Sequence, residues 1–248
     1  MSEDRALAAT PSEASRARTV GEVDLLVSGC RACPRLVAWR EMVAAGKRAA
    51  FRDQTYWGRP VPGFGDGQAW LLVVGLAPAA HGGNRTGRMF TGDSSGDFLF
   101  AALHRAGLAS QQHSVRAGDG MTLTGTRLTA PVHCAPPDNK PTPAERDTCA
   151  PFLARELELL APTVQVAVVL GGFGWQALLA SLERQGWLLP RPRPKFGHGV
   201  EVEVQGPSGQ RLVLLACYHV SQQNTFTGKL TPPMIDAVLA RAAQLRPR

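Results

Sequence analysis

Four of the chain's five cysteines are spaced in a way that could bind a metal. Cys30 and Cys33 form a C-x-x-C pair followed by proline, whereas Cys134 and Cys149 lie far along the chain and are separated by fourteen residues. Two distant segments must therefore meet if all four thiolates are to hold one group. Structural zinc and an iron-sulfur cluster both accept four thiolates, so the cysteines alone leave that choice open. Cys217 ends an apolar run and is expected to pack in the core.

Two further segments carry polar or glycine-rich patterns typical of ligand-binding loops. Residues 75–98 read GLAPAAHGGNRTGRMFTGDSSGDF, and their glycines would let backbone amides approach an anion or a base edge. The segment lacks both the Walker ending and the dinucleotide fingerprint. Residues 218–233 read YHVSQQNTFTGKLTPP, with His219 directly after an apolar run. An isolated histidine is usually a core residue, so its position alone leaves a functional role open.

The elements that must position these loops alternate along the chain. Short apolar runs predict buried strands at residues 70–75, 128–133, 164–171 and 211–217. Helical spacing predicts helices at residues 96–107, 142–160 and 173–186, and a last helix after Thr231. This order predicts an α/β fold, a three-layer α/β/α sandwich around a four-stranded, mostly parallel sheet. Residues 188–209 are expected to form a loop and a small hairpin. Ligands of such sheets bind beyond the carboxyl ends of the strands, where the polar loops stand.

Length and charge set the broad class. A chain of 248 residues with 44% hydrophobic composition predicts one domain, residues 21–248, after a flexible tail of residues 1–20. The net charge of +7 comes mostly from arginines and favours a nucleic-acid partner, with Arg31, Arg35 and Arg40 expected to hold phosphates. There is no secretory signal and no apolar run of membrane-spanning length, so we expect a cytoplasmic protein without a membrane partner, most simply a monomer.

Taken together, the motifs resemble the uracil-DNA glycosylase superfamily, and specifically its fifth family, the iron-sulfur enzymes of bacteria and archaea. The resemblance rests on the first cysteine pair, GLAPAAHGGNRTGRMFTGD, VHCAPPDNKPTP with the later cysteine, and HVSQQNTFTG, and it spans residues 30 to about 233. It implies a monofunctional glycosylase that acts on DNA containing uracil and initiates base excision repair. It also implies a structural 4Fe-4S cluster, whose ligands would be Cys30, Cys33, Cys134 and Cys149.

The resemblance also implies site residues. Relatives carry an acidic residue at the second or third position of the tetrapeptide that here reads Gly75-Leu76-Ala77-Pro78, where both positions are apolar. Catalysis must therefore draw on another group, and Asp93 of the same loop is the nearest candidate. The alternative for Asp93 is to cap the following helix.

Family members similar to this chain implicate the matching aspartate together with Asn139 and His219. Phe90 resembles the aromatic residue that stacks on the flipped base, and Gly75 and Ala77 are expected beside that base. The QQNTFTG loop is expected to wedge into the duplex.

The breadth of substrates follows from Ala130, which stands in LTAPVHC where uracil-restricted relatives carry asparagine. Alanine cannot read the uracil edge with a paired donor and acceptor. We therefore expect hypoxanthine and ethenocytosine to be accepted as well as uracil. Two other classes remain open: a non-catalytic iron-sulfur module that binds nucleic acid, and a nucleotide-binding α/β enzyme with structural zinc.

Overall fold

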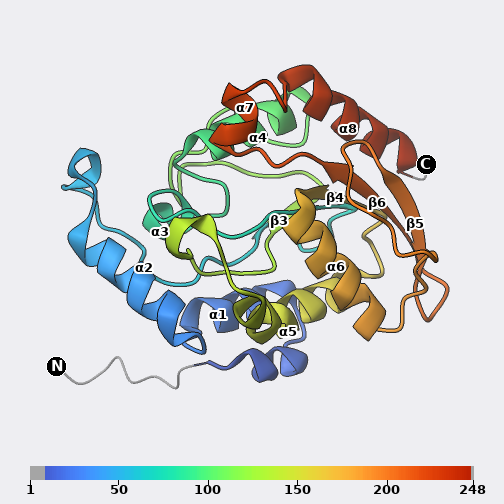
Figure 1. The fold of residues 1–248 in the computed structure, drawn as a ribbon, viewed down its shortest axis with the longest axis horizontal. Helices are drawn as coiled ribbons and strands as arrows, with labels where there is room; N and C mark the ends of the chain where they lie inside the picture. Colours follow the sequence, from blue (N-terminus) through green and yellow to red (C-terminus); the bar gives the residue numbers. More distant parts are fainter. Residues whose placement is uncertain (1–8, 247–248) are drawn as a thin grey trace.

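The computed structural model describes residues 9–246, and Figure 1 shows helices on both sides of one central sheet. The strands are β1 (Phe64–Gly65), β2 (Leu71–Val74), β3 (Thr126–Thr129), β4 (Val166–Leu170), β5 (Glu201–Gln205) and β6 (Arg211–Cys217). The α-helices are α1 (Val20–Gly29), α2 (Pro34–Gly46), α3 (Gly83–Thr86), α4 (Ser94–Arg105), α5 (Pro143–Leu160), α6 (Gly172–Arg184), α7 (Gln222–Phe226) and α8 (Pro232–Leu245). The 3-10 helices are η1 (Pro11–Arg16), η2 (Ala49–Phe51) and η3 (Pro137–Asn139).

The sheet has the order β1-β3-β2-β4-β6-β5. The four strands predicted from the sequence are β2, β3, β4 and β6, which run parallel to one another. The α/β class is confirmed, but the expected number of four strands is wrong, because antiparallel strands β1 and β5 add one edge each. Strand β1 is too short to leave a periodic signal, and the predicted small hairpin instead extends the sheet by pairing β5 with β6.

Alternate side chains of the central strands enter two separate cores, which produces the predicted layers. One core joins Leu71 and Val73 to α4 and α8, and the other joins Leu72 and Val74 to α5 and α6. Every residue of β2 and β4 is buried, as expected for parallel strands covered on both faces. Cys217 belongs to the first core, as predicted.

Strand β3 ends earlier than the sequence pattern predicts. The prediction ran to His133, but the strand stops at Thr129, two residues before Pro131. Proline has no N–H to donate to a neighbouring strand, so it ends regular pairing. Residues 130–134 therefore leave the sheet.

The amino-terminal segment differs from the expected tail. Residues 1–8 lie outside the described part, but η1 packs against α5 and buries Ala14 and Ala17 beside Phe152. Nε of Arg155 also donates to the carbonyl of Ala17 over 2.8 Å. The expectation of a tail is therefore wrong for residues 11–17. None of the helices within residues 9–246 has the length and apolar character needed to cross a membrane.

A buried ion network joins the helices that carry two of the cysteines. Nη2 of Arg127 on β3 donates to both carboxylate oxygens of Asp24 on α1, over 2.8 and 2.9 Å, and its Nε donates to Glu156 on α5. Thr129 also donates to Glu156 over 2.5 Å. With these carboxylates satisfied, α1 and α5 are fixed against the edge of the sheet.

Candidate active site and cysteine cavity

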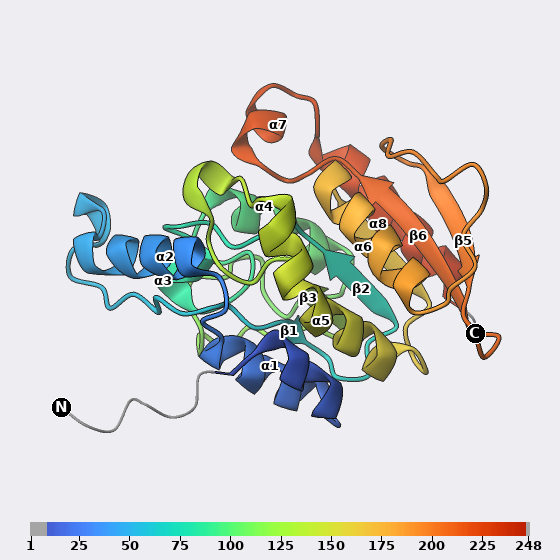
Figure 2. The same cartoon turned by 60° about the horizontal axis from the view of Figure 1, so that its bottom comes forward.

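The loops that follow β2, β3 and β6 meet at the carboxyl ends of these parallel strands and enclose a cleft of about 770 Å³. This is where an open α/β sheet is expected to bind its ligand. Figure 2 shows α7 beyond the end of β6, and α2 projecting from the body on the far side. Six residues singled out from the sequence line the cleft: Ala77, Phe90, Asp93, Ala130, Asn139 and His219.

Phe90 stands in the cleft in a left-handed backbone conformation, with φ of 51°. Such a conformation is unusual for a bulky residue and persists only where the surroundings hold it. Its ring lies against Gly75, where an added Cβ would be 2.5 Å from the ring carbon Cζ. Its carbonyl lies against Gly96, where an added Cβ would be 1.9 Å from the oxygen. Gly75 therefore lies behind the ring of Phe90 and makes room for it, and is not among the residues that line the cleft.

Asp93 both caps α4 and faces the cleft. Its Oδ1 accepts a hydrogen bond from the backbone N–H of Gly96 over 2.9 Å, so the capping role considered from the sequence is real. Its Oδ2 lies beside Gly82, where an added Cβ would be only 2.0 Å away. Burial raises the pKa of Asp93, and hydrogen bonds from the backbone of Gly96 and Ser95 oppose that rise. One carboxylate oxygen is thus fixed by the helix, and the other is held at a glycine of the cleft wall.

His219 follows β6 directly and is neutral at physiological pH. Burial lowers the pKa of its imidazole to about 4. Its Cβ lies close to Gly171, and its backbone carbonyl accepts a hydrogen bond from the side chain of Asn224 over 2.8 Å. A neutral imidazole in this place can donate one N–H to a ligand without carrying charge into the cleft.

Asn139 and Ala77 occupy opposite loops of the cleft. Asn139 ends η3 with φ of 55°, a left-handed conformation that asparagine adopts more easily than most residues, and its side chain is exposed. Ala77 is half-buried in the loop after β2. With His219, the cleft therefore brings together side chains from three separate parts of the sequence.

The residues of the cleft that were not singled out from the sequence include Arg48, Phe51, His81 and Lys140. His81 lies in the glycine-rich loop, where its position beside Gly82 was a usable signal. Its Nδ1 lies 3.0 Å from the hydroxyl of buried Tyr56. Arg48 and Phe51 come from the end of α2 and from η2, a region with no pattern that predicts a site.

Arg85 fixes that region against the glycine-rich loop. Its guanidinium stacks over Phe51, with Cζ 3.9 Å from the ring centre, and donates to Gln54 over 2.6 Å. It also donates to the carbonyls of His81 and Gly92, each over 2.7 Å. One buried cation therefore sets the relative position of two walls of the cleft.

The four cysteines of the predicted ligand set line a second, apolar cavity. Cys30 ends α1, Cys33 precedes α2 as its N-cap, Cys134 lies in the loop after β3, and Cys149 lies within α5. The remaining walls are mostly apolar side chains such as Leu36 and Phe152. Among residues 9–246, no three His, Cys, Asp or Glu side chains are grouped so as to hold a single metal ion.

One of these four thiols accepts a hydrogen bond from a side chain, that from the guanidinium of Arg40 to Cys134. The distance from Nη1 of Arg40 to Sγ of Cys134 is 3.3 Å.

Burial raises the pKa of all four thiols, to about 12 for Cys134, and neighbouring cysteine sulfurs raise it further for Cys33, Cys134 and Cys149. Burial alone therefore disfavours the thiolate form. A bound cationic group would offset that cost. The cavity thus brings together four cysteines, the number that a group with four thiolate ligands requires.

The three arginines beside the first cysteine pair all make contacts within the protein. Arg40 is only 2% exposed and donates to Cys134 and to the carbonyl of Cys30, so the expectation that it holds phosphate is wrong. Its Nε is buried without a partner. Arg31 and Arg35 pair instead with Glu41 and Glu145. These three guanidinium groups are thus engaged within the protein.

Known proteins resemble this chain over most of its length. A family model for the uracil DNA glycosylase superfamily matches residues 62–243. A type-5 uracil-DNA glycosylase of Mycobacterium tuberculosis is 56% identical over 232 residues, which cover 94% of this chain and 84% of that protein. Corresponding proteins of Thermus thermophilus and Pyrobaculum aerophilum are 52% and 45% identical, covering 88% and 86% of this chain and 94% and 88% of theirs. The chain therefore belongs to the uracil DNA glycosylase superfamily.

Proposed function

We propose that this protein removes uracil from DNA by hydrolysing the bond between the base and its sugar. The observation that carries the proposal is the cleft, where Asp93, Asn139, His219 and Phe90 meet at the carboxyl ends of three parallel strands. The names of the type-5 relatives support the same activity. A base inside a duplex is out of reach of such a cleft, so the nucleotide must first leave the stack.

The chemistry separates charge, and the cleft offers a group for each side. As the bond from C1′ to the base nitrogen breaks, its electron pair leaves with the base and the sugar becomes cationic. Ionised Asp93 stabilises that cation and orients water, whose oxygen bonds to C1′. Water supplies a hydroxyl to the sugar and a proton to the base, so the products are free base and an abasic site. The neutral imidazole of His219 and the amide of Asn139 donate hydrogen bonds to the departing base.

The surroundings of the cleft fit a flipped nucleotide and its backbone. Phe90 offers an aromatic ring on which a base can stack, a contact that contributes roughly 1 to 3 kcal/mol. The exposed cations Arg48 and Lys140 lie at the cleft and attract phosphates. Helix α7 carries Phe226, whose side chain is 79% exposed, and we assign to this helix the insertion into the duplex.

For the cysteine cavity we propose a 4Fe-4S cluster held by Cys30, Cys33, Cys134 and Cys149. The support is the convergence of four cysteines on one apolar cavity, where the Arg40 guanidinium donates to Cys134. When bound, such a cluster links α1, α2, the loop after β3 and α5, and so stabilises the fold. No step of base removal passes through it.

The proposed range of bases extends beyond uracil to hypoxanthine and ethenocytosine. Ala130 is 1% exposed and lines the cleft, so no side-chain amide at this position reads the edge of the base. Selection then depends on shape, stacking and the stability of the leaving base.

The experiment is a panel of oligonucleotides, each with one uracil, hypoxanthine or ethenocytosine, with the released base identified by chromatography. We expect the wild-type protein to release all three, and Ala130→Asn to keep uracil while losing at least tenfold on the other two. Release of uracil alone by the wild type would limit the activity to uracil. Binding without release of any base would instead support the non-catalytic module.

A further inference from the structure

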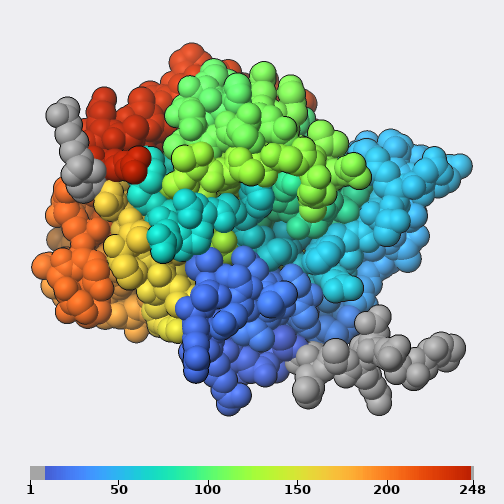
Figure 3. All heavy atoms as spheres, turned by 180° about the vertical axis from the view of Figure 1, so that it is seen from behind, coloured from blue at the N-terminus to red at the C-terminus, as the bar shows by residue number. Residues whose placement is uncertain are grey.

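The strained conformation of Phe90 must be maintained by groups outside the cleft. A left-handed backbone at a bulky residue relaxes unless the peptide groups on both sides are held. Residues 109–123 lie behind the Phe90 loop, and none of the described residues in that range lines the cleft. In Figure 3 the green part of the chain, which includes this segment, forms a rounded surface beside the red carboxyl-terminal helix.

A chain of hydrogen bonds runs from this segment to the peptide that precedes Phe90. The guanidinium of Arg88 donates to Asp119 Oδ1 and to Ser114 Oγ, each over 2.8 Å. The hydroxyls of Ser114 and Thr91 lie 2.7 Å apart. Because the Thr91 hydroxyl donates to the carbonyl of Met89 over 3.1 Å, Ser114 is the donor to Thr91. This series of hydrogen bonds thus ends on the carbonyl of Met89, which belongs to the peptide directly before Phe90.

The peptide that follows Thr91 is held as well. The hydroxyl of Thr86 donates to the carbonyl of Thr91 over 3.1 Å. Thr91 is fully buried and Ser114 is 2% exposed, so water cannot replace the bond between their hydroxyls. These contacts hold the peptide directly before Phe90 and the peptide that follows Thr91.

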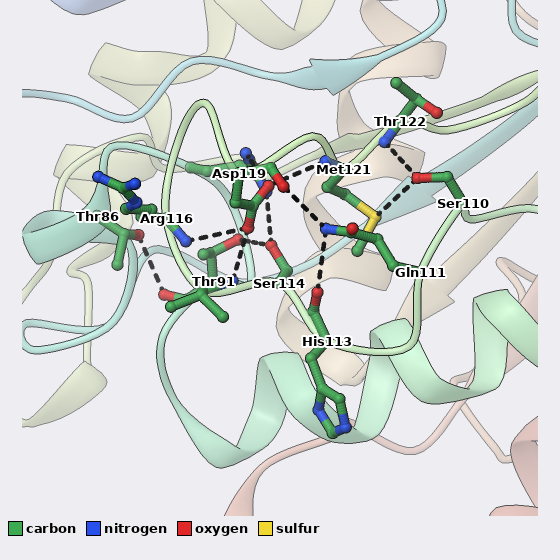
Figure 4. Close-up of polar contacts among 12 residues, drawn as sticks. Thr86, Thr91, Ser110, Gln111, His113, Ser114, Arg116, Asp119, Met121 and Thr122 are labelled. Carbon is green, nitrogen blue, oxygen red and sulfur yellow. Dashed lines mark hydrogen bonds and ion pairs between the residues drawn. The ribbon is translucent and has the colours of Figure 1, made fainter.

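Asp119 holds residues 109–123 together. Figure 4 shows it at the centre of the polar contacts of this segment. Its Oδ2 accepts from the backbone N–H groups of Val115 and Arg116, over 2.8 and 3.2 Å, and its Oδ1 accepts from that of Met121 over 3.0 Å. Burial raises the pKa of Asp119, but these bonds and the one from Arg88 outweigh burial and hold it well below its usual range. Asp119 is therefore ionised throughout the working pH range.

We propose that Ser114 and Thr91 are positioning residues that hold the Phe90 ring in place for a flipped base. The inference rests on the proposed function for the role of the ring, but the placement of the ring can be tested without activity. Neither Thr91 nor Ser114 lines the cleft, and their hydrogen bonds lead to the peptide directly before Phe90.

The chain provides a matched control in the same segment. Ser110 lies near the start of residues 109–123, where its hydroxyl oxygen accepts a hydrogen bond from the backbone N–H of Thr122 over 2.9 Å. In Figure 4 the Ser110 hydroxyl contacts Thr122 and the sulfur of Met121, and no dashed line joins it to Thr91 or Ser114. Ser110→Ala therefore removes a serine hydroxyl from the same segment and leaves the hydrogen bonds of Ser114 and Thr91 in place.

The first readout is the ring itself, with 4-fluorophenylalanine placed at position 90 and followed by fluorine NMR. We expect the resonance to shift or broaden in Ser114→Ala and in Thr91→Val, and to stay unchanged in Ser110→Ala. If Ser114→Ala does not fold, the isosteric Thr91→Val gives the same test. An unchanged resonance in the folded variants would overturn the proposal, whether or not the wild type releases uracil.

The second readout is steady-state cleavage of uracil-containing DNA. We expect Ser114→Ala to raise KM about tenfold with kcat within about threefold, as for lost stacking, and Ser110→Ala to change neither by more than about twofold. In a Phe90→Ala background, Ser114→Ala should add less than about twofold, because the residue it positions is gone. A further tenfold loss in that background would show that Ser114 acts by another route and would overturn the proposal.

Discussion

The cysteine cavity and the cleft both gather residues from distant parts of the chain, but they are built in opposite ways. The cavity is apolar, and three of its four cysteines belong to the ends or the body of α-helices. The cleft is open and mixes polar with apolar side chains, and its main side chains stand in loops. Three non-glycine cleft residues, Phe90, Asp138 and Asn139, have positive φ, whereas no cysteine of the cavity does within the described chain. Strain is concentrated where ligand chemistry is expected, and regular helices surround the thiols.

The two regions share one segment. After β3, Ala130 lines the cleft, Val132 to Cys134 line the cavity, and residues 138–140 return to the cleft. Damage to the cavity should therefore reach the cleft through this segment, because the segment would lose its attachment. A change in the cleft, in contrast, should leave the cavity intact. Substitutions in the cavity and in the cleft test whether damage passes in one direction only.

The largest expected effect is on the cavity side. Cys149→Ala removes one of four thiolates from α5, and we expect loss of iron and of soluble protein together, because separate segments lose their common link. Iron content and the melting temperature measure this effect. Cys217→Ala is the matched control, since it removes a buried thiol from the core alone and should cost only about 1 kcal/mol. Cys149→Ala protein with unchanged iron and melting temperature would contradict the proposed cluster.

A substitution in the cleft wall should reduce activity and spare the fold. In Gly82→Ala the new Cβ would stand 2.0 Å from Asp93 Oδ2, so the carboxylate must turn away. We expect kcat for uracil release to fall at least tenfold, with the free energy of unfolding lowered by no more than about 2 kcal/mol, the contribution of an N-cap. Gly21→Ala on α1 meets only an ordinary contact of 3.8 Å and should be active. Equal rates for the two variants would show that the carboxylate position is unimportant.

The smallest effect concerns pH. Burial raises the pKa of Asp93 above its ordinary value of 3.8 and lowers that of His219 to about 4. Asp93 is needed ionised and His219 is neutral above its pKa, so single-turnover rates should be nearly constant from pH 6 to 8. At lower pH they should fall as Asp93 takes up a proton, with a midpoint above 3.8. Melting temperatures over the same range separate this loss from unfolding. Rates that rise as pH falls through 6.5 would mean that protonated His219 is the active form.

The sequence predicted the parts of this molecule that residue type and periodicity determine. The four cysteines line one cavity, the four predicted strands are parallel, and the polar loops meet at the carboxyl ends of those strands. The contributions of Arg48 and Phe51 could not be predicted, because only the packing of Arg85 brings their region to the cleft. The expectation that Arg40 holds phosphate was wrong because an arginine is usually exposed, whereas the folded structure buries Arg40 against the sulfur of Cys134.

Strand boundaries were the other limit. β1 has two residues and no pattern of its own, and β3 ends early at a proline that the apolar run concealed. Asp93 illustrates a different limit, since capping and catalysis were treated as alternatives. The structure shows that one oxygen caps the helix while the other faces the wall of the cleft.

The most direct test of this account compares Asp93→Ala with the wild-type protein on DNA containing a single uracil. Three quantities are measured on the same preparations: the single-turnover rate of uracil release, the Kd for the DNA and the iron content. We expect the rate to fall about a hundredfold or more, with Kd within about threefold and iron unchanged, because Asp93 acts in the transition state and lies apart from the cysteine cavity. A wild-type rate in Asp93→Ala would contradict the assignment of the chemistry to this cleft.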